Sequence, residues 1–405
     1  MKKFENFICF LFVAAIVGVL VTHFTTGWTI PEIIAVIGGE DIPTKDKRAL
    51  YDFEQDIAKR KTSTGVSKPD WDTSLYSWEE APYVMMDLLN ETPENYFIDW
   101  KNTTSTSGAA GHSLNVAYFE ELMDGQGEAE MERAADSILS TIPDNISDWD
   151  KARLIHDALI RHITYKENPY DQTAYGALVK GEAVCNGYAM AYEYLLNKVG
   201  IPCDTVTGYS SQLSQQTDSI PFPFQEQGLF EPGKSANHAW NIVTFHDNGI
   251  EKSYFVDVTW DDFDKKNNQN EDYISYNWFC VTMEDLLAEG RSMVSEFYNL
   301  SDWNLSNNSM NYYFYTGNVI ESYDRAQITQ CLQKQMEEGK NILSVRMPDL
   351  DSYHNVLFPL EDGDLSAICS DLGLEGYARN YTYDYIGDGI LCLNIFTNYP
   401  ESAQN

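Results

Sequence analysis

Positive charge is scarce in this sequence of 405 residues. Lysine and arginine number 27 against 62 aspartates and glutamates, which gives a formal net charge of −35 at pH 7. A surface this acidic repels the phosphates of nucleic acid and of anionic lipid, so we expect no nucleic-acid partner. The chain is long enough to bury a full core in two or three domains.

Metal-binding motifs are also absent. The seven cysteines include no C-x-x-C pair and no H-E-x-x-H occurs, which argues against a dedicated zinc site. An odd number of cysteines argues against a complete disulfide framework. Cys280, Cys369 and Cys392 lie in apolar runs and are expected to be small core residues. The acidic run at 261–272 lacks EF-hand spacing and is expected to be a solvated loop. We predict no metal site and no cofactor.

One long apolar run lies near the N-terminus. Lys2 and Lys3 precede an uncharged stretch from Phe7 to Val21, and lysines ahead of such a segment place the N-terminus in the cytoplasm. The run is longer than the apolar part of a usual signal peptide, and no clear cleavage site follows it. We expect a membrane anchor over 1–27 with the rest of the chain extracytoplasmic. A cleaved signal peptide and a secreted protein are the alternative.

The rest of the chain divides by composition into four parts, and no feature predicts an oligomeric state. They are a polar stalk (28–74), an N-terminal α+β region (75–145), a central domain that carries the motifs described next (146–299) and a C-terminal α+β domain (300–405). In the C-terminal domain, YYFYTGNVI (312–320) is expected to form a strand ahead of a helix at 325–338. The polar, Gln-rich segment 210–237 is long for a loop in a compact domain. We expect it to pack on its own domain, and a substrate-covering lid is the alternative.

One cysteine stands directly ahead of a helical run. From Cys185, apolar or aromatic residues recur at helical spacing, and Gly200 and Pro202 end the pattern. The N-terminus of a helix favours an anion, and a thiolate is such an anion. A buried structural thiol is the alternative, because free cysteine is among the most buried residue types.

Two alternating runs, NHAWNIVTF and EKSYFVDVTW, follow and are joined by HDNGI. Asn-Gly between such runs predicts a hairpin with a two-residue turn. In that register His238 opposes Thr259, and Asp257 is its diagonal neighbour on the same face. Diagonal neighbours lie about 7–8 Å apart, within reach of an imidazole–carboxylate hydrogen bond. The hairpin therefore supplies a base and the group that orients it, while Cys185 supplies a nucleophile.

Other side chains near these motifs are expected to be structural. Trp240 and Trp260 flank the hairpin and are expected to pack beneath the site. His156 and His162 lie on the preceding predicted helix, where they are expected to pack or to face solvent rather than to act in catalysis.

The segments YGALVKGEAVCNGYAMAYEYLL, NHAWNIV and YFVDVTWDD resemble the transglutaminase-like superfamily of papain-fold enzymes, in the form found in many bacterial secreted or membrane-attached proteins. The resemblance covers about 149–282. It implies an α+β fold with a papain-like core, in which a helix bearing the cysteine packs on an antiparallel sheet bearing the histidine and aspartate. The flanking regions are small α+β additions to this core.

The resemblance also implies roles for individual residues. Cys185 is then the nucleophile, His238 the general base and acid, and Asp257 the group that orients His238. Tyr175 and Gln172, upstream of the cysteine, are the candidate side-chain donors to the oxyanion. The implied reaction is acyl transfer from a protein or peptide amide through a thioester, with hydrolysis favoured over cross-linking. A domain that has lost catalysis and acts as an extracellular binding module is the alternative.

Overall fold

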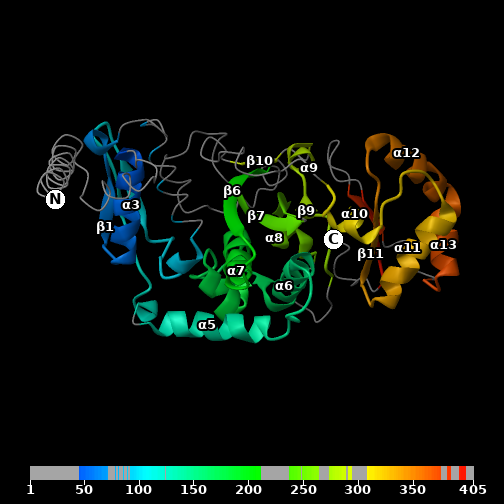
Figure 1. Cartoon of the computed structure of the whole chain (residues 1–405), viewed down its shortest axis with the longest axis horizontal. Helices are drawn as coiled ribbons and strands as arrows, with labels where there is room; N and C mark the ends of the chain where they lie inside the picture. Colours follow the sequence, from blue (N-terminus) through cyan, green and yellow to red (C-terminus); the bar gives the residue numbers. More distant parts are fainter. Residues whose placement is uncertain are drawn as a thin grey trace, which may run out of the picture. The chain divides into compact units, whose positions relative to one another are not determined.

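The structure of the chain is a computed structural model (Figure 1). It describes residues 45–71, 78, 81, 85, 89, 92–123, 125–210, 237–247, 249–263, 273–288, 291–293, 308–374, 381–384 and 392–397. The predicted membrane segment and most of the predicted loop at 210–237 lie outside these residues. Within the described part of the chain, no helix is both long enough and apolar enough to cross a bilayer. The chain divides into two compact units, one of 1–81 with 106–113 and one of 82–105 with 114–405.

The first unit has regular structure where the sequence predicts a polar stalk. Helix α3 spans Lys45–Ala58, strand β1 spans Ser63–Ser67 and a short 3₁₀ turn follows at Lys68–Asp70. Phe53 and Ile57 are buried on α3 at a spacing of one helical turn. The stalk prediction is therefore wrong for these residues, because a sparse apolar stripe suffices to bury one face of a helix. Strand β1 belongs to a sheet of order β1-β3-β2, with β2 at Thr104–Ser107 and β3 at Gly111–Asn115.

Two helices lead into the central domain. Helix α5 spans Gln126–Leu139 and helix α6 spans Asp148–His162. The hydroxyl of Ser147 accepts a hydrogen bond from the backbone N–H of Asp150 at 3.0 Å, which is the geometry of a helix N-cap. Short 3₁₀ turns precede these helices at Pro93–Asn95 and Glu120–Leu122.

A five-stranded antiparallel sheet of order β10-β6-β7-β8-β9 forms the centre of the second unit (Figure 1). Helix α7, Cys185–Lys198, packs on it, and the Asn241 side-chain amide of β7 donates to the carbonyl oxygen of Ala189 at 2.9 Å. The strands are β6 (Cys203–Ser210), β7 (His238–Asp247), β8 (Ile250–Val256), β9 (Phe279–Val281) and β10 (Arg291–Met293). A parallel pair, β4 (Thr164–Tyr165) with β5 (Glu182–Ala183), and a π-helical turn (Gly176–Lys180) precede α7.

Strands β7 and β8 pair in the predicted register. Asn241 faces Val256, and Asp247 faces Ile250 across the turn. Gly249 has a φ of +81°, a conformation that glycine adopts without strain at the second position of an Asn-Gly turn. The turn sequence therefore fixes which residues of the hairpin share a face.

The second strand of the hairpin is shorter than predicted. Pairing ends at Val256, and Asp257 instead caps the one-turn helix α8, Val258–Asp261, by accepting from the backbone N–H of Trp260. Thr259 lies inside this helix and does not oppose His238. Aspartate is a strong N-cap residue, and this preference outweighs the strand pattern of the sequence.

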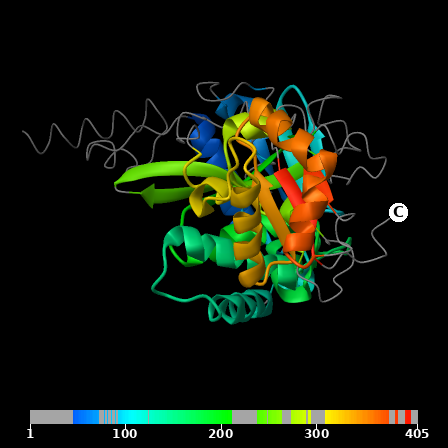
Figure 2. The same cartoon turned by 90° about the vertical axis from the view of Figure 1, so that its right-hand side faces the viewer.

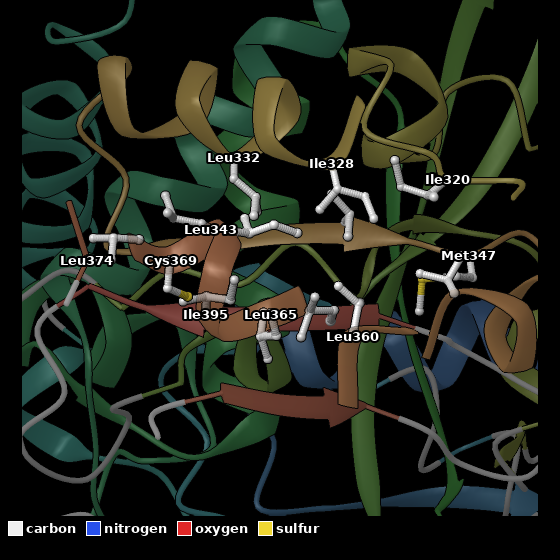
Figure 3. Close-up of a cluster of buried hydrophobic side chains, with 14 of the residues drawn as sticks. Ile320, Ile328, Leu332, Leu343, Met347, Leu360, Leu365, Cys369, Leu374 and Ile395 are labelled. Atoms are coloured by element: carbon white, nitrogen blue, oxygen red, sulfur yellow. The ribbon is translucent and has the colours of Figure 1, made fainter. Parts of the chain in front are cut away.

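The C-terminal part of the second unit has its own sheet and core (Figures 2 and 3). The sheet has the order β11-β13-β12, and Leu343 and Ile395 on one of its faces pack with Leu332 and Cys369 from the helices. The elements are β11 (Ile342–Arg346), β12 (Tyr381–Asp384), β13 (Cys392–Phe396), α11 (Arg325–Glu337), α12 (Leu350–Pro359), a π-helical turn (Leu360–Asp364) and α13 (Leu365–Asp371).

Helix α10, Tyr312–Thr316, occupies the position of a predicted strand. The side chain of Asn311 accepts from the backbone N–H of Tyr313, and Gly317 ends the helix with a φ of +76°. A polar cap and a terminal glycine thus override the strand preference of four aromatic residues. The remaining short helix is α9, Met283–Ala288. Cys280, Cys369 and Cys392 are buried, as the sequence predicts.

A buried ionic cluster joins α6 to α8. The fully buried His156 has its Nδ1 3.0 Å from Oδ1 of Asp157 and its Nε2 3.3 Å from Oδ2 of Asp261. The Tyr276 hydroxyl donates to Asp157 at 3.0 Å, and the backbone N–H of Trp278 donates to Asp261 at 3.0 Å. Burial alone lowers the pKa of His156, but the two carboxylates outweigh it and raise that pKa to about 9. His156 is therefore an imidazolium that holds the C-terminal end of α8.

Replacing His156 by Phe tests this cluster. The variant leaves the buried Asp261 without its cation and Asp157 with Arg153 as its remaining cationic partner, so the free energy of unfolding should fall by about 3–5 kcal/mol at pH 6. The folded pKa of about 9 exceeds the unfolded value, so the stabilisation is full below about pH 6.5 and is lost as pH rises through about 9. Urea unfolding at pH 10 should show a difference about 3 kcal/mol smaller than at pH 6.

The matched control is His246→Phe. His246 and its partner Glu251 are both exposed, with 3.0 Å between Nε2 and Oε1, so this change should alter the free energy of unfolding by less than about 1 kcal/mol at either pH. An equal effect of the two substitutions would contradict the assignment of a buried ionic cluster.

Candidate active site

Cys185 is the first residue of α7, as the sequence predicts. Val184 occupies the N-cap position in an extended conformation, and its side chain has no atom that could accept from the helix N–H groups. The backbone N–H of Val184 donates to the carbonyl of Asp171 at 3.0 Å, and the Asn186 amide donates to the carbonyl of Gln172 at 2.9 Å. Residues 171–172 therefore lie beside the first turn of α7.

The glycine in the CNG sequence is required by this close approach. A Cβ built on Gly187 would lie 2.5 Å from the carbonyl oxygen of Asp171 and 2.7 Å from Cβ of Ala183. Contacts this short are not tolerated, so any larger residue would displace the segment that lines the helix N-terminus.

His238 and Asp257 form the hydrogen bond that the hairpin register predicts. His238 begins β7, Asp257 directly follows β8, and 2.6 Å separates Nε2 of His238 from Oδ2 of Asp257. Both residues are buried. Oδ1 of Asp257 accepts from the backbone N–H of Trp260 at 3.0 Å. Because the carboxylate is held through both oxygens, it fixes the imidazole plane and directs Nε2–H toward itself.

Arg291 is a residue of this site that the sequence analysis does not predict. Its guanidinium is buried, and Nη1 lies 2.5 Å from the same Oδ2 of Asp257. Arg291 belongs to β10, where it pairs with Ser210 of β6. The segment around it has no periodicity or motif, so its approach to Asp257 depends on a sheet edge that only the fold reveals.

Trp240 and Trp260, which are predicted to pack beneath the site, surround this arginine together with Trp278. The Arg291 guanidinium carbon lies 3.6 Å from the ring centroid of Trp278, 4.6 Å from that of Trp260 and 5.6 Å from that of Trp240. Trp240 and Trp260 also contact the His238 ring, with centroids 5.7 and 5.9 Å apart. The indoles thus form a packed base for the charged groups.

Electrostatics keep Asp257 ionised. Burial alone raises the pKa of Asp257, but the positive charges of His238 and Arg291 outweigh burial and hold that pKa well below its usual range. Burial also raises the pKa of the Tyr165 hydroxyl, and the carboxylates of Glu167, Asp171 and Asp257 raise it further.

The two candidate oxyanion donors have different surroundings. The Tyr175 hydroxyl donates to Oε2 of Glu130 on α5 at 2.6 Å, an arrangement that does not support the predicted role. Gln172 is buried, and its backbone carbonyl binds the side chain of Asn186, the residue after Cys185. An oxyanion role for Gln172 stays a prediction.

The sulfur of Cys185 is enclosed, since the residue has 0 % of its surface exposed. The six cysteines of the described residues are all free thiols. Within the same residues, no group of three or more His, Cys, Asp or Glu side chains could hold a metal ion. Most of the acidic run at 261–272 lies outside them.

Helix α6 carries His156 and His162, the two histidines that the sequence predicts to be structural. His156 belongs to the buried cluster described above, and the exposed His162 ring contacts the carbonyl oxygen of Leu178 at 2.8 Å. Both therefore have structural partners, in agreement with the sequence analysis.

Comparison with known proteins identifies the central region. Residues 132–260 match the model of the transglutaminase-like superfamily. Solved structures with partial similarity include a TGase (11% identity, TM-score 0.23, covering 39% of this chain and 43% of that protein). A proposed protease from Parabacteroides distasonis (13%, 0.21, 38% and 32%) and a proposed cysteine protease from Cytophaga hutchinsonii (15%, 0.22, 39% and 61%) are also similar.

The chain spans less than two thirds of the length of each of these three proteins. No protein with a curated description matches the sequence. The family match nevertheless coincides with the elements that carry Cys185, His238 and Asp257. Residues 132–260 are thus similar to the transglutaminase-like superfamily, and their helix packed on an antiparallel sheet fits an α+β fold with a papain-like core.

Proposed function

We propose that the transglutaminase-like domain is a thiol acyl-transfer enzyme in which Cys185 attacks the carbonyl carbon of a peptide or glutamine amide. The observation that carries the proposal is the buried pair of His238 and Asp257, with 2.6 Å between Nε2 and Oδ2. A histidine oriented by a buried carboxylate is the base that an activated cysteine requires.

The orientation of His238 defines its proposed task. Asp257 holds the proton on Nε2, which leaves Nδ1 as the ring nitrogen that takes the proton of the Cys185 thiol. The resulting imidazolium remains beside the ionised Asp257 carboxylate, and the thiolate remains at the N-terminus of α7. Both charges are thereby stabilised, and the thiolate becomes reactive near neutral pH.

The reaction then proceeds by addition and elimination. The thiolate sulfur bonds to the amide carbon, and the carbonyl oxygen becomes an oxyanion that backbone N–H groups in the first turn of α7 can stabilise. The carbon–nitrogen bond breaks as the imidazolium of His238 gives its proton to the departing amine. A thioester on Cys185 remains, which water or another amine resolves with His238 as the base.

The acceptor of the acyl group decides between two activities. Water gives hydrolysis of a peptide or side-chain amide bond, and a lysine amine gives a protein cross-link. We favour hydrolysis because water is present at every turnover. We also propose protein or peptide substrates outside the cytoplasm, with attachment to the membrane through residues 1–27 or secretion after cleavage there.

Selective alkylation tests the nucleophile. Burial raises the pKa of the Cys203 and Cys280 thiols well above their ordinary value, so both should stay protonated. In the full chain at pH 6, iodoacetamide should modify Cys185 at least about tenfold faster than either, since an ordinary thiol is almost wholly protonated there. Peptide mapping by mass spectrometry after partial alkylation measures the three rates.

His238→Ala should slow the alkylation of Cys185 at pH 6 at least about tenfold, because the cation beside the thiolate is lost. His246→Ala, at an exposed site on the same strand, is the matched control and should leave the rate unchanged. Equal labelling of Cys185, Cys203 and Cys280, with no effect of His238→Ala, would refute the enzyme and favour a binding module.

Asp257→Asn separates proton transfer from thiol reactivity. Hydrolysis of dye-labelled casein should fall by about 10²–10⁴, because an amide cannot hold the imidazole in the required tautomer. Alkylation of Cys185 should fall much less. Asp285→Asn is the matched control, since Asp285 pairs with the buried Arg346 elsewhere in the same unit. Incorporation of dansylcadaverine into casein, compared with its hydrolysis, identifies the acceptor.

A further inference from the structure

Arg291 has no part in the mechanism above, although it touches the residue that orients the base. We propose that Arg291 is a positioning residue of this site, which fixes the Asp257 carboxylate and thereby sets how His238 holds and releases its proton. The proposal rests on the proposed function, because it assigns Arg291 a role in the same cysteine–histidine chemistry.

The first observation that supports the proposal is the set of hydrogen bonds to the Asp257 carboxylate. Oδ2 lies 2.6 Å from Nε2 of His238 and 2.5 Å from Nη1 of Arg291, while Oδ1 accepts from the backbone N–H of Trp260 at 3.0 Å. Three donors on two oxygens leave the carboxylate no free rotation. Charge-assisted bonds of this kind are shorter and stronger than neutral ones, so the orientation of the imidazole depends directly on the arginine.

The second observation is the set of tryptophan rings around the Arg291 guanidinium. Trp278, Trp260 and Trp240 come from the segment before β9, from α8 and from β7, and their ring centroids lie 3.6, 4.6 and 5.6 Å from the guanidinium carbon. A planar guanidinium stacks on aromatic faces, whereas a lysine ammonium does not fit such a cage equally well. The cage thus fixes the position of the positive charge before any substrate binds.

The charge of Arg291 has a chemical consequence. The Arg291 guanidinium and the His238 imidazole contact the same oxygen of Asp257. The positive charge of Arg291 therefore offsets part of the negative charge that would otherwise stabilise the imidazolium. Within the described part of the chain, Tyr165 on β4 and Asp261 on α8 also interact electrostatically with Asp257, and neither of these two is a cation. Arg291 therefore favours release of the proton from His238, the step in which the departing amine is protonated.

The pH dependence of Cys185 alkylation by iodoacetamide tests this role in the full chain. A thiolate–imidazolium pair gives two inflections, one where the thiolate forms and an upper one where His238 loses its proton. Arg291→Gln removes the charge but keeps an N–H donor, and should move the upper inflection upward by about one pH unit. Arg291→Lys keeps the charge but not the planar group that stacks on the indoles, so it should return the inflection only part of the way toward that of the original chain.

Arg346→Gln is the matched control. Arg346 is also buried, pairs with Asp285 and lies 5.9 Å from the ring centroid of Phe314, so its loss should affect the fold to a similar degree. It should leave the upper inflection unchanged. Folding of each variant is checked by circular dichroism, and Arg291→Met is the second neutral variant, with the same expected shift.

The outcomes distinguish failure of the role of Arg291 from failure of the proposed enzyme activity. If the original chain shows rapid labelling at pH 6 but Arg291→Gln keeps its profile, the role of Arg291 is overturned and the enzyme stands. A shift of equal size in Arg346→Gln also overturns it. If both neutral variants fail to fold while Arg291→Lys folds with the original profile, the charge serves the fold alone and the proposal is overturned. Slow labelling of Cys185 in the original chain overturns both proposals together.

Discussion

The carboxylate of Asp257 is the group on which the arrangement of this domain depends. It ends a strand, caps a helix through Oδ1 and accepts from His238 and Arg291 through Oδ2. Burying one unpaired carboxylate would be strongly unfavourable, and the hydrogen bonds from His238, from the Arg291 guanidinium and from a backbone N–H make the burial possible. Local backbone geometry and the electrostatics of the site are therefore set by the same two oxygen atoms.

Helix α8 links this site to the ionic cluster behind it. The helix is one turn long, with Asp257 at its N-terminus and Asp261 at its C-terminal end. Asp261 is held by the buried imidazolium of His156 on α6, while Trp260 between them packs against His238 and Arg291. A helix this short has little stability of its own, so its position is determined by the charges at both ends.

Local sequence patterns predicted the hairpin register and the start of α7. Contacts between segments far apart in the chain were not predicted. The Asn-Gly turn specified the register of the hairpin, and helical periodicity placed Cys185 at the start of α7. Arg291 was out of reach because its approach to Asp257 requires β10 to pair with β6, about 80 residues earlier in the chain. The strand predicted at 312–320 failed for a local reason, since capping and a terminal glycine outweighed the strand preference of aromatic residues.

The enclosure of Cys185 has a consequence for its redox chemistry. A thiolate is the form of cysteine that peroxides oxidise, first to a sulfenic acid and then irreversibly to sulfinic and sulfonic acids. Susceptibility to these reactions follows both thiolate character and exposure, and Cys185 has 0 % of its surface exposed. Because a peroxide and an alkylating reagent must reach the same enclosed sulfur, the packing around Cys185 should slow its oxidation and its alkylation together.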